Sequence, residues 1–285
     1  MYTQDLLIKS DRDVRRARID SVMGKVISIS ALLAVIPLFA VISLILIKAL
    51  PFLTSDFFLN NPLDEHKGVL NAIIGSLQMS ALTMVITSPI GIAGGIYLAE
   101  YASPRISEIG DTVLDILLGV PSIIAGLFAY LIVVPILGAS GASGSIALSI
   151  LTLPIIMRTT REVVRLVPTS LREASLALGV PVWRTTVLVT VRTALPGVLT
   201  GLVLAVSRSL GETAPLLMTA IGSNALNVLD FSAPMNAMTL VIFRYANSPS
   251  ELEVGQAWAT ALVLMLIALA LNISVRWRTI DARVS

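Results

Sequence analysis

The sequence contains no cysteine and a single histidine, His66. Without cysteine, the chain has no disulfide framework, no thiol nucleophile and no thiolate metal site. One histidine is too few for a metal cluster built on imidazole ligands. Because Asp64, Glu65 and Lys67 surround His66, we expect it to lie in a solvated turn. The composition therefore argues against thiol chemistry and against histidine-bound metals.

Charged residues are also scarce. They make up 13% of the 285 residues, whereas a soluble domain carries about 25%. Hydrophobic residues make up 55%, and the mean hydropathy is +0.88. A soluble domain of this length cannot bury so much apolar surface, because roughly a quarter of the surface of its unfolded chain still faces water after folding. We exclude a soluble enzyme and predict a membrane protein.

Four runs contain no charged residue at all: 26–47, 68–99, 116–157 and 254–275. About 20 apolar residues of helix cross a bilayer. The third run is too long for one helix at about 1.5 Å per residue, and its Pro135 and small-residue stretch break it.

We therefore predict an all-α polytopic fold with six transmembrane helices, near residues 26–50, 69–99, 112–137, 145–157, 193–221 and 254–275. A charged cytoplasmic tail, 1–25, precedes a single transmembrane domain, 26–285. Within this domain the core covers 69–278, and a cytoplasmic loop covers 158–192.

The positions of Lys and Arg set the orientation, because cytoplasmic loops carry an excess of them. With the N-terminus inside, sixteen basic and eleven acidic residues lie on the cytoplasmic side, against three basic and six acidic residues outside. We predict that both termini are cytoplasmic. The pI of 9.1 then reflects topology, so we expect contact with membrane lipid and none with nucleic acid.

The loop 158–192 begins as a helix that leaves the membrane and stops at Pro168. Ser170 and Glu173 have the spacing of a capping box, which predicts a short helix over 171–178. Gly179 would end this helix in the left-handed conformation, and Pro181 would prevent it from resuming.

On this short helix, Leu171, Ala174, Ser175 and Leu178 would share one small apolar face. A membrane-surface helix is one interpretation. However, the apolar area is too small to anchor in lipid, and a stripe of small residues fits a groove in another protein. The pattern favours docking to a partner.

The stretch from Glu173 to Gly179, EASLALG, resembles the EAA-x3-G loop of ABC importer permeases, whose helix inserts into the ATP-binding subunit. The resemblance implies that the 171–179 helix couples to an ATPase through Glu173, Ala174, Ser175, Leu178 and Gly179. One departure follows the loop: the family's I-x-L-P is replaced by VTVR at 189–192. This leaves open the angle at which span five enters the membrane.

Residues 207–217, SRSLGETAPLL, resemble the GETAPLL signature of the A-type permease (PstA) family of phosphate importers. The stretches 95–101 (GIYLAEY) and 119–122 (GVPS) are similar to other parts of that family. The resemblance covers about 69–278 and implies the MetI-like fold of a type I importer permease in the inner or plasma membrane of a bacterium or archaeon.

The same resemblance implies three partners: a second, homologous permease subunit, a dimer of cytoplasmic ATP-binding subunits and an extracytoplasmic phosphate-binding protein. The sequence has no G-x-x-x-x-G-K-[ST] loop, so we expect the chain to bind no ATP and no other cofactor. It would not be an enzyme, because the partner ATPase holds ATP and Mg²⁺. The net negative charge outside would repel free phosphate, which favours delivery by a binding protein.

Two charges, Arg208 and Glu212, fall inside predicted span five, four residues apart on one helix face. A charge at this depth costs about 2.5–3.5 kcal/mol on insertion scales, so it must face protein or water. The pair either fixes the register of the helix or lines an anion path, where the arginine fork suits phosphate oxygens. The resemblance favours a translocation path formed by Arg208, Glu212 and Thr213.

Two alternatives to a phosphate importer remain at this point. Another oxyanion, sulfate or molybdate, is the nearest alternative substrate. An ion-coupled secondary transporter would use Arg208 and Glu212 as a relay, but it leaves the cytoplasmic helix unexplained. An intramembrane enzyme lacks the histidine, cysteine or paired carboxylates that it would need at membrane depth.

Other positions carry smaller predictions. Asn71, Gln78 and Thr83 in span two would form hydrogen bonds between helices or line the path. The glycines of 91–95 would permit close helix contact, and Gly119 and Pro121 would break span three. The segment 231–243 would form an amphipathic helix near the outer face.

Overall fold

The computed structural model describes residues 11–64 and 67–284. The prediction for His66 therefore lies outside the described residues. The chain divides into two units, Met1–Lys48 and Ala49–Ser285, and each is described by itself.

The first unit contains helix α1, Asp11–Ala49. It begins within the segment expected to be a tail, so the predicted helix at 26–50 extends fifteen residues further toward the N-terminus. Its stretch of highest hydropathy lies within Arg18–Phe52, a candidate membrane span. Leu32 and Phe39 are among its many exposed apolar side chains, as expected of a helix whose solvent is lipid.

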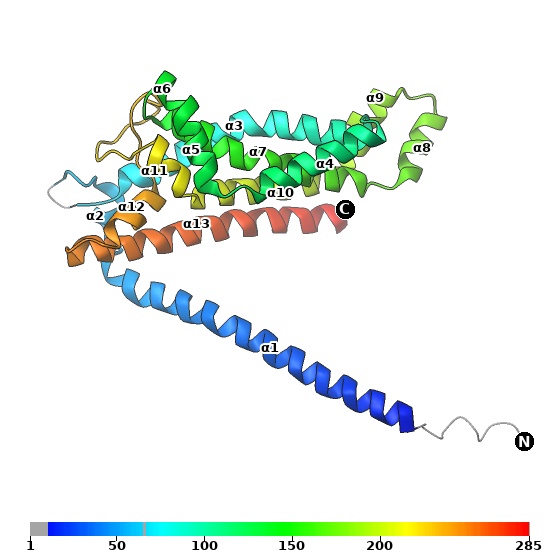
Figure 1. The fold of residues 1–285 in the computed structure, drawn as a ribbon, viewed down its shortest axis with the longest axis horizontal. Coiled ribbons are helices and arrows are strands. Elements are labelled where there is room, and N and C mark those ends of the chain that lie inside the picture. The colour runs from blue at the N-terminus through cyan, green and yellow to red at the C-terminus, as the bar shows by residue number, and fades with distance from the viewer. Residues whose placement is uncertain (1–10, 65–66, 285) are drawn as a thin grey trace, which may run out of the picture. The chain divides into compact units, whose positions relative to one another are not determined.

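The second unit is built from short and long helices: α2 (Ser55–Leu59), α3 (Leu70–Glu100), α4 (Pro104–Gly119), α5 (Ser122–Ile132), α6 (Val134–Leu137), α7 (Gly141–Arg165), α8 (Thr169–Ala177), α9 (Val182–Thr185), α10 (Arg192–Gly211), α11 (Ala214–Thr219), α12 (Met238–Tyr245) and α13 (Glu251–Val284). A 3₁₀ turn, Leu50–Phe52, precedes α2, and a π-helical turn, Thr186–Val191, joins α9 to α10. The long helices α3, α7, α10 and α13 run side by side (Figure 1).

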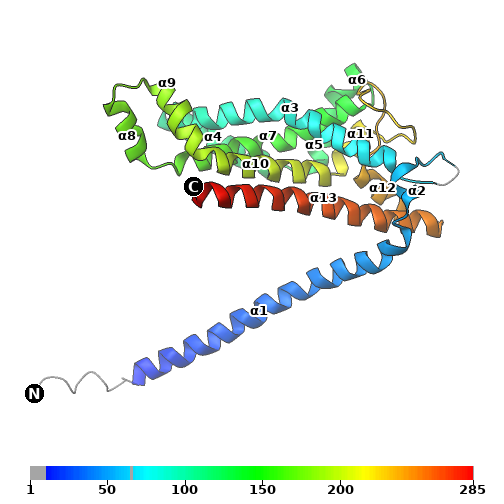
Figure 2. The same ribbon diagram turned by 180° about the vertical axis from the view of Figure 1, so that it is seen from behind.

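The two ends of this bundle differ. Helices α8 and α9 and the end of α13 lie at one end, whereas α2, α6, α11 and α12 lie at the other (Figures 1 and 2). The loop 158–192 and the C-terminal part of the chain are thus on the same side of the bundle, in agreement with the predicted topology.

Five helices of the described chain are long and apolar enough to cross a membrane, and α4 with α5 makes a sixth if the bent pair is one span. The pair bends by 95° at Val120 and Pro121, where proline lacks an amide donor and disfavours helical backbone in the residue before it. The break predicted at Gly119 and Pro121 is therefore confirmed. The predicted bounds of span three, 112–137, are wrong, because the two helices run from Pro104 to Ile132.

Helices α3 and α7 form the most extensive contact in the bundle. Gly91 lies against the side chain of Ile156, and a Cβ at Gly95 would come within 2.6 Å of the Met157 carbonyl oxygen. Only hydrogen on these Cα atoms allows the two backbones to approach so closely. The prediction that the glycines of 91–95 permit close helix contact is confirmed.

Polar side chains of α3 also form hydrogen bonds with other segments of the bundle. The Asn71 amide nitrogen donates to the Ser223 carbonyl at 2.7 Å, the Thr83 hydroxyl donates to the Ser145 carbonyl at 3.1 Å, and Gln78 accepts the Leu229 amide at 3.0 Å. The Thr83 bond joins α3 to α7, as predicted for a helix–helix contact. Asn71 and Gln78 instead bind the loop that follows α11.

The expected amphipathic helix at 231–243 is wrong for the first half of this segment. Helix begins only at Met238, and Met235, Asn236 and Met238 are buried. The segment is drawn into the bundle because the Ser76 hydroxyl accepts the Met238 amide at 2.8 Å and the Asn236 carbonyl lies directly against Gly75.

We predict that Gly75→Ala lowers the free energy of unfolding by about 1–3 kcal/mol, the typical cost of overpacking. The new methyl group would collide with the Asn236 backbone, which cannot rotate away. Gly119→Ala is the matched control, because nothing lies within 4 Å of a Cβ at that position. Thermal unfolding of the purified protein in detergent measures both, and equal midpoint shifts would contradict the prediction.

Candidate functional site

Helix α8 is the short helix that the sequence predicts between the membrane and the partner. It starts at Thr169, immediately after Pro168, and no side chain caps its first turn. The predicted capping box is therefore wrong: Ser170 is already inside the helix, so it does not occupy the capping position. At the other end Gly179 has φ +81°, which confirms its predicted left-handed role.

The side chains of α8 divide between two surfaces. Glu173, Ala174 and Leu171 are exposed, and Leu178 is 84% exposed. Ser175 instead faces the protein, where its hydroxyl lies 2.9 Å from the Thr185 hydroxyl of α9. The predicted common face is therefore incomplete, because Ser175 holds α8 to the rest of the loop.

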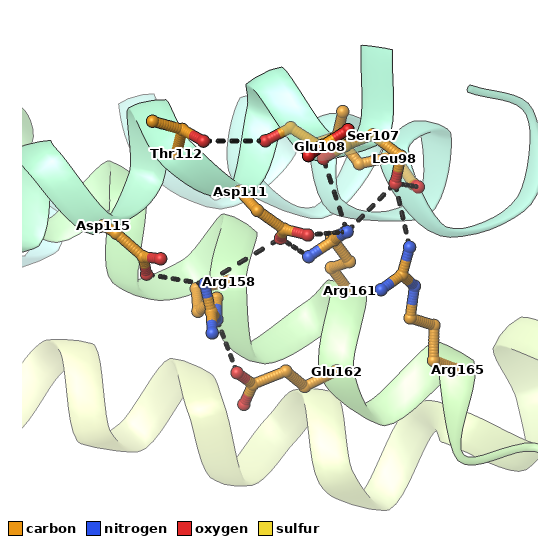
Figure 3. A network of polar contacts seen from close by, with 10 residues as sticks. All are labelled: Leu98, Ser107, Glu108, Asp111, Thr112, Asp115, Arg158, Arg161, Glu162 and Arg165. Carbon is orange, nitrogen blue, oxygen red and sulfur yellow. Dashed lines mark hydrogen bonds and ion pairs between the residues drawn. The ribbon is translucent and has the colours of Figure 1, made fainter. Parts of the chain in front are cut away.

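A network of charges lies where α7 approaches α4 (Figure 3). Arg161, only 3% exposed, forms an ion pair with Asp111, and its guanidinium also donates to the Ser107 hydroxyl at 2.9 Å. Arg158 pairs with Asp115 at 2.7 Å. The Ser107 hydroxyl donates to the Leu98 carbonyl at 3.1 Å, so the network extends to α3.

The sequence prediction counted these arginines only as cytoplasmic charges. A signal was present, because Arg158, Arg161 and Arg165 form a basic stripe at helical spacing. Asp111 and Asp115 form an acidic pair four residues apart on α4. Two such complementary stripes on neighbouring helices indicate ion pairs between them.

The second candidate site is at the end of α10. The helix stops at Gly211, and Glu212 has an extended backbone with ψ 130°, so the predicted continuous span 193–221 is wrong. Pro215 explains the end, because it has no amide to donate to the Gly211 carbonyl and its ring would collide with that carbonyl. Helix resumes as α11.

Arg208 and Glu212 nevertheless meet. The Arg208 Nε atom lies 3.2 Å from the Glu212 carboxylate, and the Thr239 hydroxyl holds the Glu212 backbone carbonyl at 2.9 Å. Glu212 is mostly covered, but the Arg208 side chain is 44% exposed. Thr213 is half-buried beside them.

The depth of this pair follows from its neighbour. The Ser209 hydroxyl donates to the Ser80 hydroxyl at 3.1 Å, and Ser80 lies ten residues after the start of α3, roughly 15 Å along the helix. A further twenty residues of α3 follow. Arg208 therefore lies between the two ends of the bundle, in agreement with its predicted depth.

The π-helical turn Thr186–Val191 coincides with the place where the sequence departs from the I-x-L-P pattern. The chain continues from α9 through this turn into α10, and the three elements form one candidate membrane span, Val182–Gly211. Among residues 11–64 and 67–284, no group of three or more His, Asp or Glu side chains could hold a metal ion.

Comparison with known proteins places the chain among transport proteins. Residues 91–284 match the family described as the binding-protein-dependent transport system inner membrane component. The chain is 42% identical to the phosphate transport system permease protein PstA of Pasteurella multocida over 233 residues, 80% of this chain and 83% of that one. It is 44% identical to PstA of Yersinia pestis over 211 residues, 73% and 71% of the two chains.

Among solved structures, the inward-facing MetNI methionine ABC transporter has a similar fold. The TM-score is 0.57 at 17% identity, over 73% of this chain and 94% of that one. The predicted all-α, MetI-like permease fold is confirmed.

The family match, together with the helices long and apolar enough to span a membrane, identifies a multi-pass transport subunit of the inner membrane. The chain belongs to the binding-protein-dependent transport system inner membrane component family and, within it, to the PstA-type permeases.

We predict that Asp111→Asn lowers the free energy of unfolding by about 3 kcal/mol, because it leaves the buried Arg161 cation without its carboxylate. Asp115→Asn removes an equal charge from a side chain that is 63% exposed, and we expect a loss below about 1 kcal/mol. Unfolding of both variants in the same detergent tests the difference. A larger loss for Asp115→Asn would contradict the buried-pair explanation.

Proposed function

We propose that this chain is a permease subunit of an ATP-driven phosphate importer and forms the translocation path with a second, homologous permease subunit. The observation that carries the proposal is the 42–44% identity, over most of the chain, to permeases named for phosphate transport. Sulfate and molybdate importers are the rival assignment within the same class.

In this proposal, a dimer of cytoplasmic ATP-binding subunits holds ATP and Mg²⁺ and hydrolyses the nucleotide. The chain itself catalyses no reaction and binds no cofactor. Helix α8 docks against the ATPase through its exposed side, with Leu171, Ala174 and Leu178 as apolar contacts and Glu173 at the edge. Gly179 supports docking by ending the helix sharply, and Ser175 supports it from beneath.

The exposure of Arg208 supports the proposal that a second permease subunit packs beside this chain. A half-exposed guanidinium at this depth cannot face hydrocarbon at acceptable cost, so a partner subunit or a water-filled path must cover it. We assign Arg208 to the path, where its fork of donors binds phosphate oxygens. Glu212 orients the guanidinium and weakens its hold on the anion, because an ion must leave the site as well as enter it. Thr213 adds a hydroxyl beside the pair.

The proposal places both termini and the α8 end of the bundle in the cytoplasm. An extracytoplasmic binding protein delivers phosphate to the opposite end, where α11 and α12 lie. This arrangement follows the distribution of Lys and Arg.

Uptake of labelled phosphate by the reconstituted importer, in competition with unlabelled sulfate and molybdate, tests the substrate. We expect phosphate uptake that depends on ATP and on the binding protein and that resists excess sulfate. Uptake that persists without the ATPase but collapses with a protonophore would instead establish an ion-coupled transporter.

For the path, we predict that Arg208→Gln abolishes phosphate uptake and leaves the complex with the ATPase intact, because the anion loses its charged ligand. Arg105→Gln is the control, since Arg105 is an exposed residue of α4. Uptake and co-purification of the ATPase are measured on the same vesicles. Loss of the complex with Arg208→Gln would assign Arg208 a structural role.

For docking, we predict that Leu178→Glu reduces co-purification of the ATPase at least about tenfold, as expected when a central apolar contact worth roughly 1.4 kcal/mol or more is lost. The control is Leu166→Glu, at an equally exposed leucine next to α7. Equal retention in both variants would contradict docking through the end of α8.

A further inference from the structure

The stretch 95–101, which the family resemblance singles out, has no role in the mechanism described so far. It forms the last turns of α3, at the end of the bundle where α8 lies. Gly95 packs on α7. Glu100, the last residue of α3, points its carboxylate toward the loop between α7 and α10.

The partner of Glu100 is Arg172, on the inner side of α8. One Arg172 guanidinium nitrogen lies 2.6 Å from the Glu100 carboxylate and also donates to the Val164 carbonyl at 2.8 Å. The two side chains are 12% and 22% exposed. At such low exposure solvent screens an ion pair only weakly, so this contact ties α8 to α3, and the hydrogen bond to Val164 ties it to α7.

A second contact lies beside the first. The Tyr101 hydroxyl donates to the Thr186 hydroxyl at 3.0 Å, which joins the end of α3 to the π-helical turn that follows α9. Beneath both contacts, Val164, Val167, Ala194 and Val198 form an apolar cluster that also packs on α3. The end of α3 thus contacts α8, the π-helical turn and the apolar cluster of α7 and α10.

From there α3 leads to the charged pair. It packs along α7 through its glycines and carries Ser80, whose hydroxyl accepts that of Ser209 next to Arg208. A displacement of α8 that is transmitted to Glu100 therefore reaches the proposed anion path through one continuous helix. The Ser175–Thr185 contact ties α8 to α9, which continues through the π-helical turn into α10, the helix that carries Arg208.

We propose that Glu100 and Arg172 are a positioning pair that transmits the movement of α8 to α3, and so couples ATP hydrolysis to opening of the path. The inference rests on the proposed function in that it takes an ATPase as the partner of α8. It adds a residue pair that touches neither the ATPase nor the transported anion.

The test uses the reconstituted importer with Glu100→Gln, Arg172→Met and the charge exchange Glu100→Arg with Arg172→Glu. We expect each single variant to keep its ATPase subunit and to transport at least about fivefold less substrate per ATP hydrolysed, the lower range of typical coupling between two sites. The exchange should recover part of the ratio. Glu108→Gln and Arg105→Met, exposed residues of neighbouring α4, are matched controls expected at the wild-type ratio.

A wild-type ratio in both single variants would overturn the inference, as would an exchange that recovers nothing. Loss of the ATPase from the single variants would also overturn it, because the pair would then serve only to build the docking surface.

A second measurement separates this inference from the proposed substrate. The chain has no cysteine, so spin labels attached to cysteines at Val85 of α3 and Ala177 of α8, both exposed, report one distance distribution. We expect Glu100→Gln to broaden it and to uncouple its response to ATP, whichever anion is carried. An unchanged distance distribution would refute the positioning role even if phosphate uptake is demonstrated. Wild-type vesicles that take up no phosphate would refute only the proposal that phosphate is the substrate.

Discussion

The close contact between α3 and α7 supports the rest of the bundle. Lipid tails are as apolar as leucine, so no hydrophobic force drives two helices together inside a membrane. The helices must instead gain dispersion contacts over short distances, and the glycines of 91–95 permit those distances. The hydroxyl groups of Ser76, Ser80 and Thr83 then form hydrogen bonds along α3. Helix α10, which carries Arg208, packs on both of these helices.

The chain uses arginine in two different environments. Arg161 is buried, and its guanidinium contacts carboxylate and hydroxyl oxygens of α4, so it joins the two helices. Arg208 has one carboxylate nearby and nearly half of its side chain exposed. The first cation is enclosed by protein, whereas the second is accessible to an anion. This difference in exposure is the reason to propose a transport site at Arg208 and not at Arg161.

Most of the long helices could be predicted from the sequence, because charge-free runs and Pro–Gly breaks are local signals. The left-handed Gly179 and the corner at Pro121 were also local, and both were predicted correctly. The errors arise where contacts with distant segments of the chain determine the local structure. The burial of Asn236 depends on its contact with Gly75, more than 150 residues away, and hydropathy alone cannot reveal it. The end of α10 could have been predicted from a local signal, because Pro215 lies four residues after Gly211.

The candidate site was predicted in part for the same reason. The spacing of Arg208 and Glu212 survives the helix break, because a side-chain pair four residues apart can meet across a C-terminal cap. Ser175 was assigned to the wrong surface, since helical spacing gives the angle between residues but not which side faces the protein. The Glu100–Arg172 contact joins residues from two different helices, α3 and α8, so no local sequence pattern predicts it.

The corner between α4 and α5 has one more consequence. A helix that ends leaves its last carbonyl groups without amide donors, and hydrocarbon offers them none. Gly119 is exposed, and nothing lies within 4 Å of where its side chain would begin. The corner therefore cannot lie against lipid tails. It must turn toward water or toward another protein chain, which gives the bundle a wet or subunit-facing flank distinct from its lipid-facing sides.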